Sequence, residues 1–161
     1  MAFVVEDGTG KADATSYVTV AEFRSYWNDR NQYYKDYDDK TIESWLIIAT
    51  EYIDYHYKFY GYATEYDTQA LQWPRTGLRD NKGNQIASDE IPQELKDATF
   101  RLAKEATNQK DLETKVNTGE KAKRIGPVSI TYKDGFKRDF NTATKLLKHL
   151  IKNYAALRVV S

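Results

Sequence analysis

Residues 40–61, KTIESWLIIATEYIDYHYKFYG, place the strongest constraint on how this chain can fold. Apolar side chains recur there at spacings of three and four, the period that puts them along one face of an α-helix. Asp38 and Asp39 offer a cap and favourable charge at the helix start, and Gly61 offers a stop. The segment therefore predicts a long amphipathic helix. Its predicted face comprises Ile42, Trp45, Leu46, Ala49, Tyr52 and Ile53, with His56 at the core or its boundary.

Capping residues and periodicity predict three further helices. Thr19 followed by Glu22 fits a capping box, so a helix should run through residues 20–30. Pro92 suits the first turn of a helix that continues to residue 109, and Asn141 can cap a last helix over residues 142–157. The apolar faces comprise Val20, Phe23 and Trp27 in the first of these; Leu95, Ala98, Thr99, Leu102, Ala103 and Ala106 in the second; and Leu146, Leu147, Leu150, Ile151 and Tyr154 in the last.

Turns and one hairpin should join these helices. Residues 1–18 are rich in Gly and Asp and predict an extended arm, EYDTQALQ (65–72) predicts a turn of helix, and RDNKGN (79–84) predicts a turn. In KAKRIGPVSITYKDG, apolar residues around a Gly-Pro pair predict two short strands in a hairpin. These apolar residues are Ile125, Val128, Ile130 and Tyr132.

Together these elements predict a mainly α fold: a four-helix bundle with a small β-hairpin before the last helix and an extended N-terminal arm. A length of 161 residues fits a single domain. The expected parts are the arm (1–18), a helical core with a Trp-Pro-Arg loop (19–112), the hairpin (121–135) and the C-terminal helix (141–158).

Composition argues against several classes of function. Charged residues make up 30% and hydrophobic residues 40%, which is typical of a globular chain, and no apolar run is long enough to cross a bilayer. Cysteine is absent, and His56 and His149 lack metal-ligand spacing, so no metal or other cofactor is expected. Glu51 and Asp54 share a helix face, but no base, nucleophile or metal partners them. Because EDGTGK also lacks P-loop spacing, an enzyme is not expected.

The charge of the chain is zero overall but divided unevenly. Residues 1–90 hold 9 Lys and Arg against 16 Asp and Glu, a net charge of −7. Residues 91–161 hold 15 against 8, a net charge of +7. The basic half could meet nucleic acid or the acidic half of a second copy in a head-to-tail contact. Two solvated faces that merely differ in composition are the alternative.

The stretch QALQWPRTG, residues 69–77, breaks the helical pattern and could be an active-site loop, a base-stacking platform or a fixed corner. Proline disfavours helical geometry at the preceding residue, so Trp73 should be extended. We expect Trp73 to pack into the core and Pro74 to fix the turn. Arg75 would then cap a helix terminus or reach a neighbouring subunit.

Aromatic residues crowd the segment 52–66 and allow two interpretations. Tyrosines stack on unpaired bases, with nearby cations holding the backbone, but the segment carries Glu51, Asp54, Glu65 and Asp67 against Lys58 alone. A protein interface or the core is therefore favoured over base stacking. The candidate interface tyrosines are Tyr17, Tyr55, Tyr60 and Tyr62.

Basic residues gather late in the chain. Helical spacing places Lys145, Lys148 and Lys152 on one face, and KAKR precedes the hairpin. A solvated face is the default interpretation, and a surface for DNA or an acidic partner is the functional one. The residues of that candidate surface are Lys121, Lys123, Arg124, Lys145, Lys148 and Lys152.

Four stretches together resemble a phage family labelled DnaT-like single-stranded DNA-binding protein, whose members are read as head–tail connector or head-completion adaptors. The similar stretches are VVEDGTGKADATSYVTVAEFRSYW, QALQWPRTG, IPQELKDATFRLAKEA and KRIGPVSITYKDG, and they cover nearly the whole chain. The tyrosine crowding between residues 52 and 66 departs from the family pattern.

The resemblance implies a non-enzymatic virion protein with an adaptor-like helical bundle. Such a protein would be made in the host cytoplasm and would form a twelvefold ring in the neck between head and tail. It would bind the portal and a tail or tail-completion protein while DNA passes through the lumen with non-specific contacts at most. The family label implies an alternative, a single-stranded DNA-binding replication accessory protein.

Overall fold

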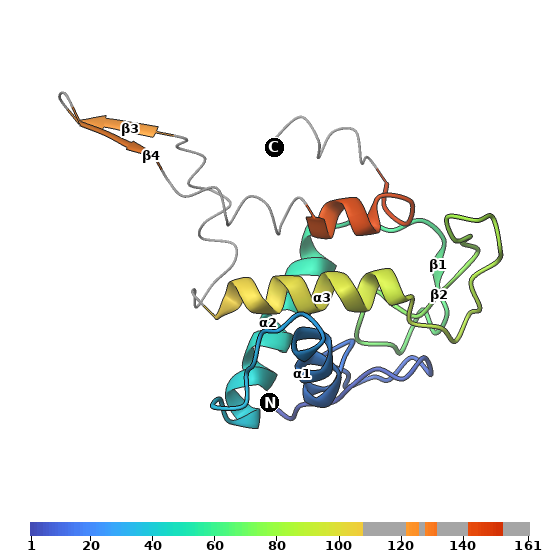
Figure 1. Cartoon of the computed structure of the whole chain (residues 1–161). Helices are drawn as coiled ribbons and strands as arrows, with labels where there is room; N and C mark the ends of the chain where they lie inside the picture. Colours follow the sequence, from blue (N-terminus) through green and yellow to red (C-terminus); the bar gives the residue numbers. More distant parts are fainter. Residues whose placement is uncertain (108–121, 126–127, 132–141, 153–161) are drawn as a thin grey trace.

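The amphipathic stretch after Asp38 forms the longest helix of the computed structural model, which describes residues 1–107, 122–125, 128–131 and 142–152. This helix is α2 (Asp39–His56), and α1 (Val20–Asn28) and α3 (Gln93–Ala106) flank it in the sequence. Residues 142–147 form a fourth helical segment. The strands are β1 (Tyr62–Ala63), β2 (Arg75–Thr76), β3 (Ala122–Ile125) and β4 (Val128–Thr131). The fold is therefore mainly helical, with short antiparallel strand pairs (Figure 1).

Local capping begins the first two helices as the sequence predicts. The Thr19 hydroxyl accepts a hydrogen bond from the Glu22 amide at 3.0 Å, and the Glu22 carboxylate accepts one from the Thr19 amide at 2.8 Å. Asp38 accepts a hydrogen bond from the Thr41 amide at 2.9 Å. Both caps satisfy amides that a helix start otherwise leaves without partners.

The core lies where α2 packs against α1 and α3, and the 142–147 segment also contributes to it. Figure 1 shows α3 between α1 and the 142–147 segment in that view. Most residues of the predicted apolar faces are buried, and Val20 and Leu146 are half-buried, which confirms the periodicity argument. The fully buried large side chains are Tyr17, Phe23, Ile42, Leu46, Ile53, Trp73, Leu95, Leu102, Leu147, Leu150 and Ile151.

Two predicted helix ends are wrong. The long helix ends at His56 rather than near Gly61, because Tyr57 adopts an extended backbone and buries its ring. The last helix ends at residue 147, because Ile151 instead forms an antiparallel bridge with Phe59. Two hydrogen bonds tie these segments together, from the Tyr60 amide to the Leu150 carbonyl and from the Lys152 amide to the Lys58 carbonyl. Residues 153–158, including Tyr154, lie outside the described residues.

His56 and residues 64–68 also differ from expectation. His56 is exposed and stacks on the ring of Tyr52 at 4.4 Å between centroids, so it does not belong to the core. Residues 64–68 form a turn rather than a turn of helix.

The N-terminal segment is not a free extended arm. It folds back on itself, with hydrogen bonds from the Thr15 amide to the Val4 carbonyl and from the Glu6 amide to the Ser16 carbonyl. Tyr17 and Val18 at its end are buried in the core. The segment is therefore part of the folded domain (Figure 1).

The predicted hairpin is confirmed. Strands β3 and β4 pair antiparallel, and Ile125 lies opposite Val128. A second pair, β1 with β2, was not predicted, and it sets Tyr62 opposite Thr76 and Ala63 opposite Arg75. This second pair brings the Trp-Pro-Arg stretch against the tyrosine-rich segment. No helix in the described part of the chain is long and apolar enough to cross a membrane.

Candidate functional site

The Trp-Pro-Arg corner is held by hydrogen bonds within its own chain. The Arg75 Nε donates to the Tyr60 carbonyl at 2.8 Å, and Nη2 donates to the Gly61 carbonyl at 2.9 Å. Its Nη1 donates to both the carbonyl and the side-chain oxygen of Gln72 at 3.0 Å. Arg75 therefore fastens two loops together and does not cap a helix terminus, while the alternative, a contact with a neighbouring subunit, stays a prediction. Trp73 is fully buried beside Phe59, as predicted.

Beneath this corner, a carboxylate and a phenol meet in a buried network. Asp54 of α2 accepts a hydrogen bond from the Tyr17 hydroxyl and another from the Gln72 amide at 3.0 Å. The Trp73 amide donates to the Tyr17 hydroxyl at 3.3 Å. Burial raises the pKa of Asp54 to about 6, although the hydrogen bonds from Tyr17 and Gln72 act in the opposite direction. Burial, followed by the charge of Asp54, raises the pKa of Tyr17 well above its usual value.

The raised pKa predicts a pH-dependent stability specific to Asp54. Because the folded state binds this proton more tightly than the unfolded state, the stabilisation is present below about pH 4 and is lost as pH rises through about 6. We expect the wild-type free energy of unfolding, relative to that of Asp54→Asn, to fall by about 2 kcal/mol between pH 4 and pH 7. Urea denaturation of both proteins across that range measures this difference. A difference that stays constant with pH would contradict the assignment.

A direct titration of the Asp54 carboxyl carbon by NMR provides an independent check. It does not depend on how well the asparagine variant folds. Tyr17 stays protonated throughout this range because its pKa is raised further. Arg75 stays charged, since burial lowers its pKa only from a value far above neutral.

The fold sorts the crowded aromatics into buried and exposed sets. Tyr52, Tyr57 and Phe59 point into the core. Tyr17, a candidate interface residue, is also buried and serves the fold. The side chains of Tyr55, Tyr60, Tyr62 and Tyr66 are exposed, by 80%, 50%, 76% and 82% respectively. Those four tyrosines lie around two open hollows.

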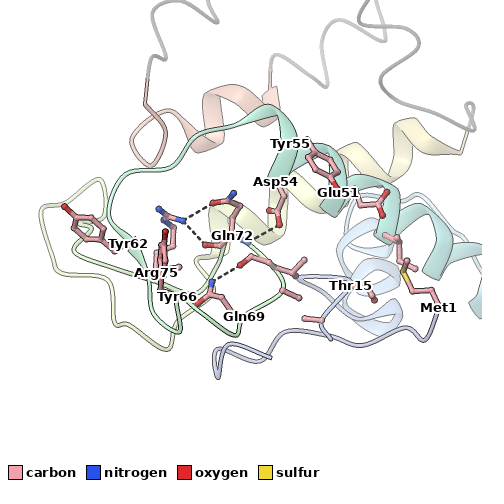
Figure 2. Close-up of a pocket in the computed structure, with 15 residues that line it drawn as sticks. Met1, Thr15, Glu51, Asp54, Tyr55, Tyr62, Tyr66, Gln69, Gln72 and Arg75 are labelled. Atoms are coloured by element: carbon pink, nitrogen blue, oxygen red, sulfur yellow. Dashed lines mark hydrogen bonds between the residues drawn. The ribbon is translucent and has the colours of Figure 1, made fainter. Parts of the chain in front are cut away.

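The first hollow, here called the acidic hollow, has a volume of about 570 Å³. Figure 2 shows Glu51 and Tyr55 of α2 on one side, Tyr62 and Tyr66 on the other, and Gln72 with Arg75 between them. Glu51 is exposed, and among the described residues its carboxylate has no hydrogen-bond or ion-pair partner. The lining residues are Met1, Ala14, Thr15, Ile47, Glu51, Asp54, Tyr55, Tyr62, Ala63, Tyr66, Gln69, Ala70, Leu71, Gln72 and Arg75.

The second hollow, here called the basic hollow, has a volume of about 500 Å³ and shares Tyr62 with the first. Its lining contains Arg79 and Lys152, both exposed, and none of the described residues that line it carries a carboxylate. Its lining residues are Tyr60, Gly61, Tyr62, Gly77, Leu78, Arg79, His149 and Lys152. The hollow therefore combines two exposed aromatic rings with two cations.

The backbone at Tyr60 and Gly61, on one side of the basic hollow, is held in a fixed conformation. Gly61 has a φ of +69°, and a Cβ there would lie 2.2 Å from the Thr76 carbonyl oxygen. Only glycine fits this approach between the two loops. Since the Tyr60 amide and carbonyl are both hydrogen-bonded, the tyrosine is held on a fixed backbone.

The predicted basic residues are only partly brought together. Lys145, Lys148 and Lys152 are all exposed, but Lys152 follows the end of the helix and lines the basic hollow. Lys123 and Arg124 are in β3. Lys121 lies outside the described residues. Arg79 was not a candidate in the sequence analysis, and a lone Arg in a turn carries no signal that could have identified it.

A metal site would require several ligand side chains close together in the described part of the chain. Within the described residues, no group of three or more His, Asp or Glu side chains could hold a metal ion. His149 borders the basic hollow, but its ring nitrogens are buried, and Nε2 is 3.8 Å from a Glu94 oxygen. The absence of enzymatic activity stays a prediction.

Fold and site together define a mainly α-helical protein with an open surface of tyrosines and charged side chains. A family model described as "Putative DnaT-like ssDNA binding protein" matches residues 1–161, and the chain belongs to this family. The match confirms the DnaT-like part of the resemblance. The family description does not mention head–tail connectors. No curated protein and no solved structure matches the chain.

Proposed function

We propose that this protein binds single-stranded DNA across the basic hollow. One observation carries the proposal: exposed Tyr60 and Tyr62 lie with Arg79 and Lys152 in one hollow, and no described residue of its lining carries a carboxylate. The family to which the chain belongs is described by the same activity.

The chemistry of unpaired DNA fits this surface. Bases stack on aromatic rings whatever their sequence, with about 1–3 kcal/mol for each base, and cations hold the phosphates. Tyr60 and Tyr62 come from the segment before the Trp-Pro corner, Arg79 comes from the segment after it, and Lys152 comes from the end of the chain's last described segment. Lys148, four residues before Lys152, is exposed and adds a positive charge outside the lining of the hollow.

The acidic surroundings of the tyrosines count against base stacking when the sequence is read alone. In the structure, Glu51 and Asp54 line the acidic hollow and are absent from the lining of the basic one. These two carboxylates therefore lie in the hollow on the other side of Tyr62, and the nearest carboxylate that a basic-hollow residue contacts is Glu94, 3.8 Å from His149. For this reason we assign the DNA to the basic hollow alone.

We expect Tyr60→Ala and Tyr62→Ala each to weaken binding of a fluorescein-labelled oligo(dT) by about 5-fold to 150-fold, the loss of one stacked base. Fluorescence anisotropy at fixed salt measures the change. Tyr33→Ala, which removes another exposed tyrosine, is the matched control and should bind as the wild type does. Equal affinity of all three variants, or no binding by the wild type, would refute the proposal.

The same titration at several salt concentrations tests the role of the cations. Removal of both Arg79 and Lys152 should reduce the slope of log affinity against log salt by about 1.4, because each phosphate contact on single strands contributes about 0.7. Lys35→Ala, at an exposed lysine outside the hollow, should leave the slope unchanged.

The head–tail adaptor function stays a prediction of the sequence resemblance, together with its ring, portal and tail partners and virion location. Neither the family description nor a feature of the described residues favours it specifically. The number of copies in purified virions, measured by mass spectrometry against the major capsid protein, would decide it.

A further inference from the structure

We propose that the acidic hollow is a docking site for the basic β3–β4 hairpin of a second copy of this chain. The proposal is independent of DNA binding, since Glu51, Tyr55 and Tyr66 do not line the basic hollow. It assigns a partner to a surface that the proposed function leaves unused.

The acidic hollow presents the chemistry of a cation-binding surface. Tyr55 and Tyr66 expose most of their side chains on opposite sides of it, with Glu51 beside Tyr55 (Figure 2). Large exposed aromatics gathered at one hollow mark interaction sites. A ring face next to a carboxylate attracts Lys and Arg through both the ring quadrupole and the ion pair.

Of the other charged side chains near the hollow, some already hold hydrogen bonds within the chain, and the rest strengthen its attraction for cations. Both Asp54 oxygens accept hydrogen bonds from Tyr17 and Gln72, and Arg75 donates to loop oxygens. The turn that carries Tyr66 adds the exposed carboxylates Glu65 and Asp67. Glu51 is therefore the carboxylate available to a partner.

The chain itself contains a segment of complementary charge. Strand β3 carries Lys123 and Arg124, and residues 121–125 contain no acidic residue. In the described sheets, β3 and β4 pair only with each other. A two-stranded hairpin alone is marginally stable in water, so a docking surface would stabilise it. The net charges of −7 for residues 1–90 and +7 for residues 91–161 extend the complementarity.

The hairpin and the hollow are different surfaces, so the contact is heterologous and each copy offers one of each. This predicts a distinctive result for two variants. Glu51→Lys destroys the hollow but keeps the hairpin, and the double variant Lys123→Ala with Arg124→Ala does the reverse. A mixture of the two can form one contact only and should stop at a one-to-one dimer.

Sedimentation equilibrium of the full chain tests the proposal. The wild type should gain mass with concentration and lose it at high salt, because the ion pairs are screened. Each variant alone should associate at least about tenfold more weakly. Glu43→Lys, the same charge change on α2 outside the hollow, is the matched control and should associate as the wild type does. Tyr55→Ala should also weaken association, and it leaves all charges in place.

Each other outcome overturns the proposal. A wild type that stays monomeric at every concentration means that the hollow binds another partner or its own hairpin. Equal association of Glu51→Lys and Glu43→Lys means that copies meet elsewhere. Failure of the mixed variants to pair, when Tyr55→Ala still weakens association, means that the hairpin is not the occupant.

Discussion

Trp73→Ala is expected to lower the free energy of unfolding by about 3–5 kcal/mol, the range for truncation of a buried aromatic. The Trp73 side chain is completely buried and meets Phe59 edge to face at 5.6 Å. The loss is a large part of the roughly 5–15 kcal/mol that holds a typical domain folded. The amides of Gln72 and Trp73 join the Tyr17–Asp54 network, so a collapse at this position would also disturb the acidic hollow that Asp54 and Gln72 line. Urea denaturation followed by circular dichroism measures the change.

Trp73→Phe provides a graded control for this result. The Trp73 Nε1 has no hydrogen-bond partner among the described residues, so phenylalanine removes volume without removing a hydrogen bond there. It should lose less stability than alanine does. Tyr33→Ala, at an exposed ring, should stay within about 0.5 kcal/mol of the wild type. An alanine variant with an unchanged midpoint would show that Trp73 is not a core residue.

Glu6→Ala is expected to have the second large effect, a loss of about 3–5 kcal/mol. The Glu6 side chain is only 3% exposed and accepts hydrogen bonds from the amides of Gly8, Gly10 and Lys11, at 2.9, 2.9 and 2.8 Å. Hydrogen bonds to a charged group contribute about 1.5–3 kcal/mol each, and buried amides left without a partner add their desolvation cost. Thermal denaturation, with hydrogen exchange at Gly10 and Lys11, measures both the global and the local loss.

Two substitutions distinguish the loss of the hydrogen bonds that Glu6 accepts from the loss of its charge. Glu6→Gln keeps one acceptor oxygen for Gly8 and Gly10 but presents a donor to the Lys11 amide, so it should fall between the wild type and alanine. Asp7→Asn changes a neighbouring exposed carboxylate and should have a much smaller effect. If Glu6→Ala and Asp7→Asn behave alike, the Glu6 carboxylate does not organise this loop.

The Glu6 loop also supports the acidic hollow. A Cβ on Gly10 would lie 2.8 Å from the Glu65 side chain, and the Ala70 amide donates to the Lys11 carbonyl at 2.9 Å. The loop therefore packs against the turn that carries Tyr66. This contact explains why a segment that reads as a loose arm belongs to the body of the domain.

Much of the helical framework could be predicted because its signals are local. The Thr19–Glu22 capping box and the Asp38 cap act within one turn of chain, and the α2 periodicity is set by residues a few positions apart. The β3–β4 hairpin is also a short-range structure. Helix ends were less predictable, since Tyr57 and Ile151 leave the helical conformation to make contacts with distant residues.

The sequence by itself determined the mainly helical framework and its caps, because these depend on neighbours along the chain. Only the tertiary structure decided which tyrosines are exposed and which charges accompany them. Tyr60 and Lys152 share the basic hollow although they are far apart in the sequence, while Glu51 lies beyond Tyr62 in the other hollow. Burial likewise singles out Asp54 from Glu51, three residues away on the same helix. Such distinctions depend on long-range packing, which no local pattern encodes.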